Sequence, residues 1–165
     1  FQCVAGNALG LAIVTVVSQC VGARRYDEAR YYTKLLLKYM YAGMWLVNLI
    51  VIFGCPIIVQ AYHLSPATGE LTEKLLIYHA FCCMTIWELS FGLPNTLRAA
   101  GDVKMTLVVS MLSMWIFRVG FSFFLGRNLG WGVFGVWVAM TIDWLFRAIL
   151  FSVRYRRGKW QEIRF

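Results

Sequence analysis

Charged residues are scarce in this chain of 165 residues: Asp, Glu, Lys and Arg make up 15% of it, whereas hydrophobic residues make up 60%. Soluble globular domains carry about 25% charged and 45–50% apolar residues, so this chain has too little polar surface to cover a water-soluble fold. The high apolar content also excludes a disordered chain, and the absence of a Gly-X-Y repeat excludes a collagen-like one. The solvent that fits such a sequence is the lipid bilayer.

Cysteine and histidine are also few. The two histidines are accompanied by five cysteines, all within or at the edges of apolar runs: Cys3, Cys20, Cys55, Cys82 and Cys83. An odd count does not indicate a disulfide framework. We interpret the histidines as lying outside metal-ligand spacing, so we expect no zinc site. We interpret the cysteines as packing residues.

Long uncharged runs dominate the rest of the chain. Residues 1–23 and 39–69 contain no charged residue, and three later runs contain only one or two. Because a membrane span takes about 20 apolar residues, the sequence predicts an all-α, polytopic transmembrane helix bundle with five spans. We place the spans at about 3–22, 36–62, 74–97, 105–126 and 131–153.

Basic residues alternate between the two sides of this topology. Twelve of the sixteen Lys and Arg residues lie in the first connection, the third connection and the tail at 154–165, and only Lys74 and Arg127 lie in the other two. The positive-inside rule therefore predicts a cytoplasmic C-terminus and basic tail. Since juxtamembrane bases account for the net charge of +8, we expect the bilayer and no nucleic acid as the partner.

Four charged residues lie deep within the predicted spans: Glu88, Arg118, Asp143 and Arg147. Each costs on the order of 2.5–3.5 kcal/mol near the centre of a membrane helix, so each is expected to face protein or water. Asp143 and Arg147 are spaced i, i+4, and we interpret them as a structural ion pair. Glu88 has no partner on its own helix. It either pairs with Arg118 or binds a proton or cation, and Arg118 is alternatively a ligand for carbonyls of a broken helix.

The first span also carries small and polar residues along one flank. Gly6 and Gly10 form a GxxxG pattern that lets a neighbouring helix approach closely. Gln19 continues this flank, and we leave two interpretations open for it: packing between helices, or lining a wet cavity.

Proline predicts bends in two spans. Pro56 is expected to kink its span at Gly54-Cys55, and Pro94 at Gly92-Leu93, which makes both candidate hinges. Residues 64–69, which include Pro66, are predicted to form an outer loop.

Three segments resemble one known family. Residues 19–30 (QCVGARRYDEAR) are similar to the segment that follows the second helix of a lobe in the MATE (multidrug and toxic compound extrusion) family. Residues 93–102 (LPNTLRAAGD) resemble its LP-x-x-LR-(G/A)-x-GD signature. Residues 132–147 and the basic segment 154–160 are similar to its last helix and tail.

The resemblance implies that the chain contains helices eight to twelve of a twelve-helix transporter with two six-helix lobes. We accordingly expect a partial C-terminal lobe, whose partner is the N-terminal lobe of the same longer chain. The implied activity is antiport across the plasma membrane, in which sodium or proton entry drives the export of small organic, often cationic, compounds. No enzyme activity, no cofactor and no metal beyond a possible sodium ion are expected.

Two other classes of protein are weighed against the exporter. A flippase of the same superfamily, for polysaccharide or lipid-linked precursors, would need a cavity rich in Arg and Lys, and these spans offer only Arg118 and Arg147. A non-transporting membrane scaffold would have no reason to keep Glu88 within a span. The exporter is therefore the favoured prediction.

Overall fold

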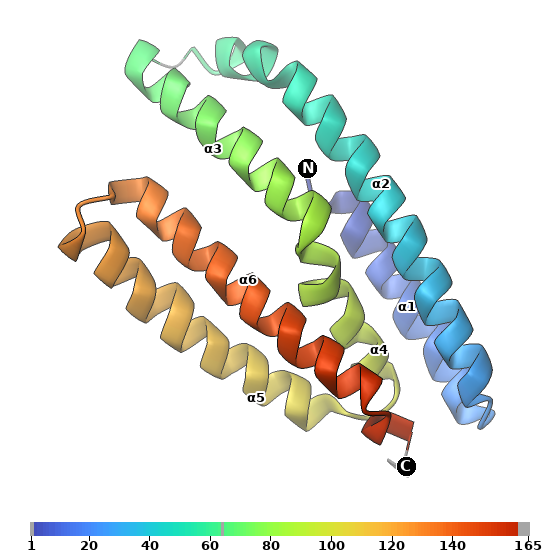
Figure 1. Ribbon diagram of the computed structural model, residues 1–165. Coiled ribbons are helices and arrows are strands. Elements are labelled where there is room, and N and C mark those ends of the chain that lie inside the picture. The colour runs from blue at the N-terminus through green and yellow to red at the C-terminus, as the bar shows by residue number, and fades with distance from the viewer. Residues whose placement is uncertain (1, 64, 162–165) are drawn as a thin grey trace.

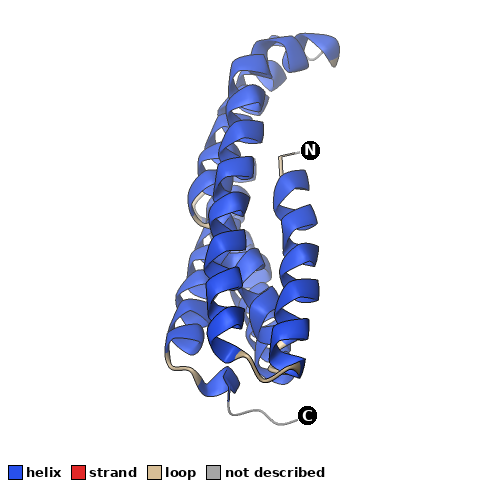
Figure 2. Ribbon diagram, turned by 90° about the vertical axis from the view of Figure 1, so that its right-hand side faces the viewer, coloured by secondary structure: helices blue, strands red, loops and turns tan. Residues whose placement is uncertain are grey.

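The chain folds as a bundle of helices. The computed structural model describes residues 2–63 and 65–161, and every regular element in them is helical (Figure 2). The elements are, in order, α1 (Val4–Gly22), α2 (Tyr26–Ala61), α3 (Pro66–Thr85), η1 (Glu88–Gly92), α4 (Leu93–Ala99), α5 (Val103–Ser113), η2 (Met114–Phe121), η3 (Phe124–Asn128), α6 (Gly132–Arg156) and η4 (Lys159–Gln161). Of these, η1, η2 and η3 are π-helical and η4 is a 3₁₀ turn. The predicted all-α fold is confirmed.

Several of these helices can cross a membrane. By length and composition, four described helices or helical rods qualify: α1, α2, the continuous rod 103–128 and α6. A fifth span results if α3 and the segment 88–99, which meet at an angle of 57°, count as one broken span. The predicted polytopic bundle of five spans agrees with this arrangement.

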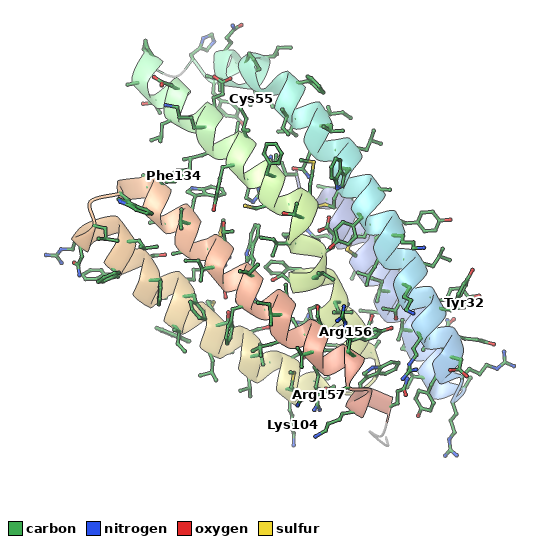
Figure 3. All side chains as sticks on the ribbon, viewed as in Figure 1. Tyr32, Cys55, Lys104, Phe134, Arg156 and Arg157 are labelled. Carbon is green, nitrogen blue, oxygen red and sulfur yellow. The ribbon has the colours of Figure 1, made fainter. Side chains whose placement is uncertain are left out.

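The helices pack around the broken span. In Figure 1, α6 lies between α5 and the rod formed by α3 and α4, and α1 lies behind α2. Helix α1 packs on both α2 and α4, and α6 packs on η1, η2 and η3. Lys104, Arg156 and Arg157 share one end of the bundle, opposite Cys55 and Phe134 (Figure 3).

Two helices begin earlier than their predicted spans. Helix α2 starts at Tyr26 and not at 36, because the charged segment before the apolar run is itself helical, with acidic residues in its first turn where they favour the helix N-terminus. Helix α3 starts at Pro66, preceded by the extended residue Ser65. Proline suits the first helical position because its missing N–H has no intrahelical partner there. The loop predicted at 64–69 is therefore wrong from Pro66 onward, and Leu64 lies outside the described residues.

The two prolines predicted to bend their spans lie in different settings. Helix α2 continues through Pro56 to Ala61 without a break, although its upper end curves toward α3 (Figure 1). The 57° break of the third span falls between Thr85 and Glu88, not at Gly92-Leu93. Pro94 instead sits in the first turn of α4, where its missing N–H is tolerated, and the π-helical turn η1 absorbs the change of direction before it.

The core lies where α1, α2, α4 and α6 meet. Its largest fully buried apolar side chains include Ile13, Met40, Met44, Leu97, Phe151 and Trp160. Glycines permit the closest approaches: a Cβ added to Gly6 would lie 2.2 Å from the ring of Trp87, and one added to Gly92 would lie 2.6 Å from the sulfur of Met40. The GxxxG residues of α1 therefore serve helix packing, as predicted.

Candidate functional site

Glu88 is a buried acidic residue at the break in the third span. It is the first residue of η1, directly after the break in the third span, and its side chain is fully buried. Neither carboxylate oxygen has a hydrogen-bond partner among the described residues. A buried carboxylate that accepts no hydrogen bond from the protein is costly to keep ionised. This position therefore calls for an ion or a proton that the rest of the described chain does not supply.

The break that positions Glu88 is fastened to α2. The indole N–H of Trp45 donates to the carbonyl oxygen of Met84 at 3.0 Å, and the Tyr41 hydroxyl donates to that of Thr85 at 3.3 Å. On the other side of the break, Trp87 packs against Gly6 of α1. Two helices thus hold the bent backbone just before Glu88.

A second polar centre joins α6 to the α5–η2 rod. Asp143 is fully buried, and its Oδ1 lies 3.0 Å from Nε of Arg147. Ser113 of α5 donates a short hydrogen bond to the same oxygen, and an Arg147 amino group donates to the carbonyl of Ser110 at 3.1 Å. The i, i+4 contact expected between Asp143 and Arg147 is thus present, and it is buried.

Arg118 belongs to this second centre and not to Glu88. Its Nε lies 3.9 Å from Oδ2 of Asp143, and its side chain is 39% exposed. Two possibilities were open for Glu88: an ion pair with Arg118, or a bound proton or cation. Among the described residues, the structure shows no ion pair between Glu88 and an arginine. The register between η2 and α6 decides this, because it sets Arg118 at the level of Asp143.

Helix α1 carries its glycines and its polar residues on different faces, whereas the sequence analysis placed them on one flank. Gly6 and Gly10 face the core, where Gly10 receives the side chain of Asn95, whereas Gln19 is exposed. Thr15 and Ser18 are exposed as well, and their hydroxyls donate to carbonyls of the preceding turn. The prediction of a single flank is wrong, since the glycines and the polar residues lie on different faces. Gln19 faces away from the other described helices.

The signature segment 93–102 links α4 to the tail. Gly101 has a φ of +86°, a left-handed conformation that favours glycine, and it ends α4 with the Asp102 amide bonded to the Leu97 carbonyl at 2.9 Å. Asp102 then accepts a 2.7 Å hydrogen bond from Nε of Arg154. Trp160 in the tail is fully buried and stacks on Tyr155. The motif residues therefore tie the end of α6 to the bundle.

His79 and Cys83 form a third polar cluster that sequence reasoning missed. The two residues are spaced i, i+4 on α3 and so share one helix face, which is ligand spacing. The statement that no histidine lies at ligand spacing from a cysteine was therefore wrong. The spacing of His79 and Cys83 could have been read from the sequence. The third residue of the cluster, Cys3, lies 76 residues before His79, and only the fold brings it next to the other two.

Comparison with known proteins agrees with the motif resemblance. The MatE family profile matches residues 1–124 of the chain. The chain belongs to the MATE family. Relatives of this MATE chain include the uncharacterized transporter YisQ of Bacillus subtilis, 38% identical over 159 residues, which are 94% of this chain and 34% of that protein. The probable multidrug resistance protein NorM of Oceanobacillus iheyensis is 27% identical over 148 residues, 89% of this chain and 33% of its own length.

The comparisons also bear on the class of the protein. No solved structure matches the chain. The MATE family consists of transporters, so the predictions of a multi-pass membrane protein and of no enzyme activity are confirmed. The chain spans about a third of the length of the curated relatives it matches.

Proposed function

We propose that this chain is part of the C-terminal lobe of a secondary active exporter, contributing helices eight to twelve of a two-lobe, twelve-helix transporter. The whole protein would carry organic, often cationic, compounds out across the plasma membrane in exchange for sodium or protons. The NorM relatives are probable multidrug resistance proteins, which supports this proposal. The basic end of the bundle in Figure 3 supports a cytoplasmic C-terminus, because basic segments favour the inner side.

The observation that carries the proposal is the buried, unpartnered carboxylate of Glu88 at the broken span. An ionisable group with no role in transport would be neutralised by a partner in the way that Asp143 is neutralised by Arg147. Glu88 is instead held at a bend, a position at which transporters bind coupling ions. We propose that Glu88 binds the coupling cation, whether sodium or a proton.

The exposed face of α1 supports a cavity shared with the missing lobe. Gln19, Thr15 and Ser18 lie on it, and no described helix covers them. Polar side chains of a membrane helix normally face protein or water and not lipid. Under this proposal they line the passage between the two lobes.

The arrangement of the arginines weighs against the flippase alternative. Arg147 is bound to Asp143 and to the Ser110 carbonyl, and Arg118 lies next to Asp143. An anionic lipid headgroup would have to compete with that buried aspartate for both arginines. No observation favours the flippase specifically.

The test uses the full-length transporter reconstituted in vesicles, with export of a fluorescent organic cation driven by an imposed sodium or proton gradient. Glu88→Gln keeps the size and removes the charge, so it is expected to abolish gradient-driven export. Glu88→Asp is expected to keep part of it. Glu70→Gln is the matched control, because Glu70 precedes the same break but is exposed and paired with Lys74. Unchanged transport and cation affinity in Glu88→Gln would contradict the proposal.

A further inference from the structure

Three soft metal ligands meet between α1 and α3, one turn before the break. The Sγ atoms of Cys3 and Cys83 are 3.7 Å apart, and Sγ of Cys83 is 3.6 Å from each ring nitrogen of His79. One ligand atom from each of the three residues lies within 4.8 Å of the ligand atoms of the other two. The proposed transport mechanism uses none of these three residues.

Their spacing matches that of ligands around one metal ion. In a tetrahedral zinc site, Zn–S bonds of about 2.3 Å and Zn–N bonds of about 2.0–2.1 Å place two sulfurs about 3.8 Å apart and a sulfur and nitrogen about 3.6 Å apart. The two pairs that involve Cys83 already have these separations. The ligand atoms of the remaining pair, Cys3 and His79, lie within 4.8 Å of each other.

A neighbouring amide holds His79 in the tautomer that a metal needs. The side-chain oxygen of Gln2 lies 2.5 Å from Nδ1 of His79, and the amide nitrogen of Gln2 donates to the Leu76 carbonyl at 3.3 Å. An amide oxygen only accepts hydrogen bonds, so Nδ1 must be the donor and Nε2 keeps its lone pair. Metal-binding histidines are typically oriented in this way by an outer carbonyl or carboxylate.

Aromatic rings fix the imidazole from the other side. The rings of Trp137 and Trp144 lie edge-on to His79 at centroid distances of 4.9 and 5.5 Å. Both come from α6, so the ring is held between two helices. An imidazole restrained in this way loses little side-chain freedom when it binds an ion.

We propose that Cys3, His79 and Cys83 bind a thiophilic d¹⁰ metal ion, Zn²⁺ or Cu⁺, with Gln2 as the outer partner of His79. Two thiolates and one imidazole suit these ions, whereas hard cations prefer oxygen ligands. The site is therefore distinct from that of the coupling cation at Glu88. Because its ligands come from both α1 and α3, a bound ion ties the start of α1 to the helix that leads into the break.

The test measures metal binding by the purified full-length transporter, kept reduced in detergent. Zn²⁺ and, separately, Cu⁺ are titrated against a competing chelator, and bound metal is counted per chain after dialysis. One of the two ions is expected to bind at one per chain, and Cys83→Ser and Cys3→Ser are expected to lose it. Gln2→Ala keeps all three ligands and is expected to weaken binding about 10–100-fold.

Cys82→Ser is the matched control, since Cys82 is adjacent to Cys83 but its sulfur lies 3.5 Å from the Thr141 hydroxyl, away from the cluster. It is expected to bind metal as the unaltered protein does. Chromatographic monodispersity of every variant without metal separates loss of ligand from loss of fold. Equal metal binding in Cys83→Ser and Cys82→Ser, no stoichiometric binding of either ion, or unchanged affinity in Gln2→Ala would overturn the proposal.

Discussion

The buried contact between Asp143 and Arg147 permits a quantitative prediction. At 3.0 Å and an effective dielectric constant of about 20, two unit charges attract by roughly 5.5 kcal/mol. Removing each ion from water costs several kcal/mol, so the pair as a whole contributes little net stability. Removing one partner is different, because the other charge then remains buried without compensation.

We therefore expect Asp143→Leu to lower the free energy of unfolding by about 3–5 kcal/mol. The lower end of this range applies, because Arg147 keeps a 3.1 Å hydrogen bond to the Ser110 carbonyl and lies 5.6 Å from the ring centroid of Phe91. The double variant Asp143→Leu/Arg147→Met removes both charges at similar volume. It is expected to be more stable than Asp143→Leu alone, within about 1–2 kcal/mol of the unaltered protein.

The assay is reversible unfolding of the full-length transporter in mixed micelles, followed by tryptophan fluorescence. Glu70→Leu serves as the control, because it breaks an i, i+4 ion pair whose side chains are 69% and 66% exposed. Exposed pairs contribute little, so this variant is expected to unfold like the unaltered protein. The reasoning is refuted if Asp143→Leu is no more destabilising than Glu70→Leu, or if adding Arg147→Met makes it worse.

Two further variants test the packing by the same unfolding assay. Gly6→Ala places a Cβ 2.2 Å from the Trp87 ring and is expected to destabilise the protein by about 1–3 kcal/mol. Gly22→Ala meets nothing within 4 Å and is expected to be neutral or mildly stabilising. Equal effects of the two variants would contradict the close approach of α1 to Trp87. Trp160→Ala empties a fully buried site and is expected to cost about 3–5 kcal/mol, against little for Trp131→Ala, which is 51% exposed. A Trp160→Ala protein as stable as the Trp131→Ala one would show that the tail does not pack.

The helical spans were predictable because one property determines them. A run of about 20 apolar residues in lipid has to satisfy its backbone internally, and a helix does so. The span at 3–22 matches Val4–Gly22, and that at 131–153 coincides with Gly132–Arg156 except for its first residue and the last turn of the helix. Helix starts in charged segments were missed, because hydropathy marks where a helix enters the membrane and not where it begins.

Contacts between helices were not predictable by the same means. Periodicity shows that Asp143 and Arg147 share a face, but no pattern states which residue of a neighbouring helix lies at that level. Arg118 was consequently left with two partners, and the packing register resolved them. The site of the break was missed for a related reason. A proline shows only where a backbone N–H is absent. The bend instead lies where side chains of α2, such as Trp45, donate hydrogen bonds to carbonyls at the end of α3.

The two buried acids differ in a way that bears on function. Asp143 accepts hydrogen bonds at Oδ1 from Ser113 and Arg147, and Arg118 lies 3.9 Å from its Oδ2, so its own chain supplies opposite charge. Glu88 has no such donors among the residues that the structure describes, and it directly follows the break in the third span. A group whose charge is balanced only by an external ion makes the stability of its surroundings depend on that ion. Occupancy at Glu88 would then be coupled to the packing of the broken span, and such coupling is what an exchanger requires.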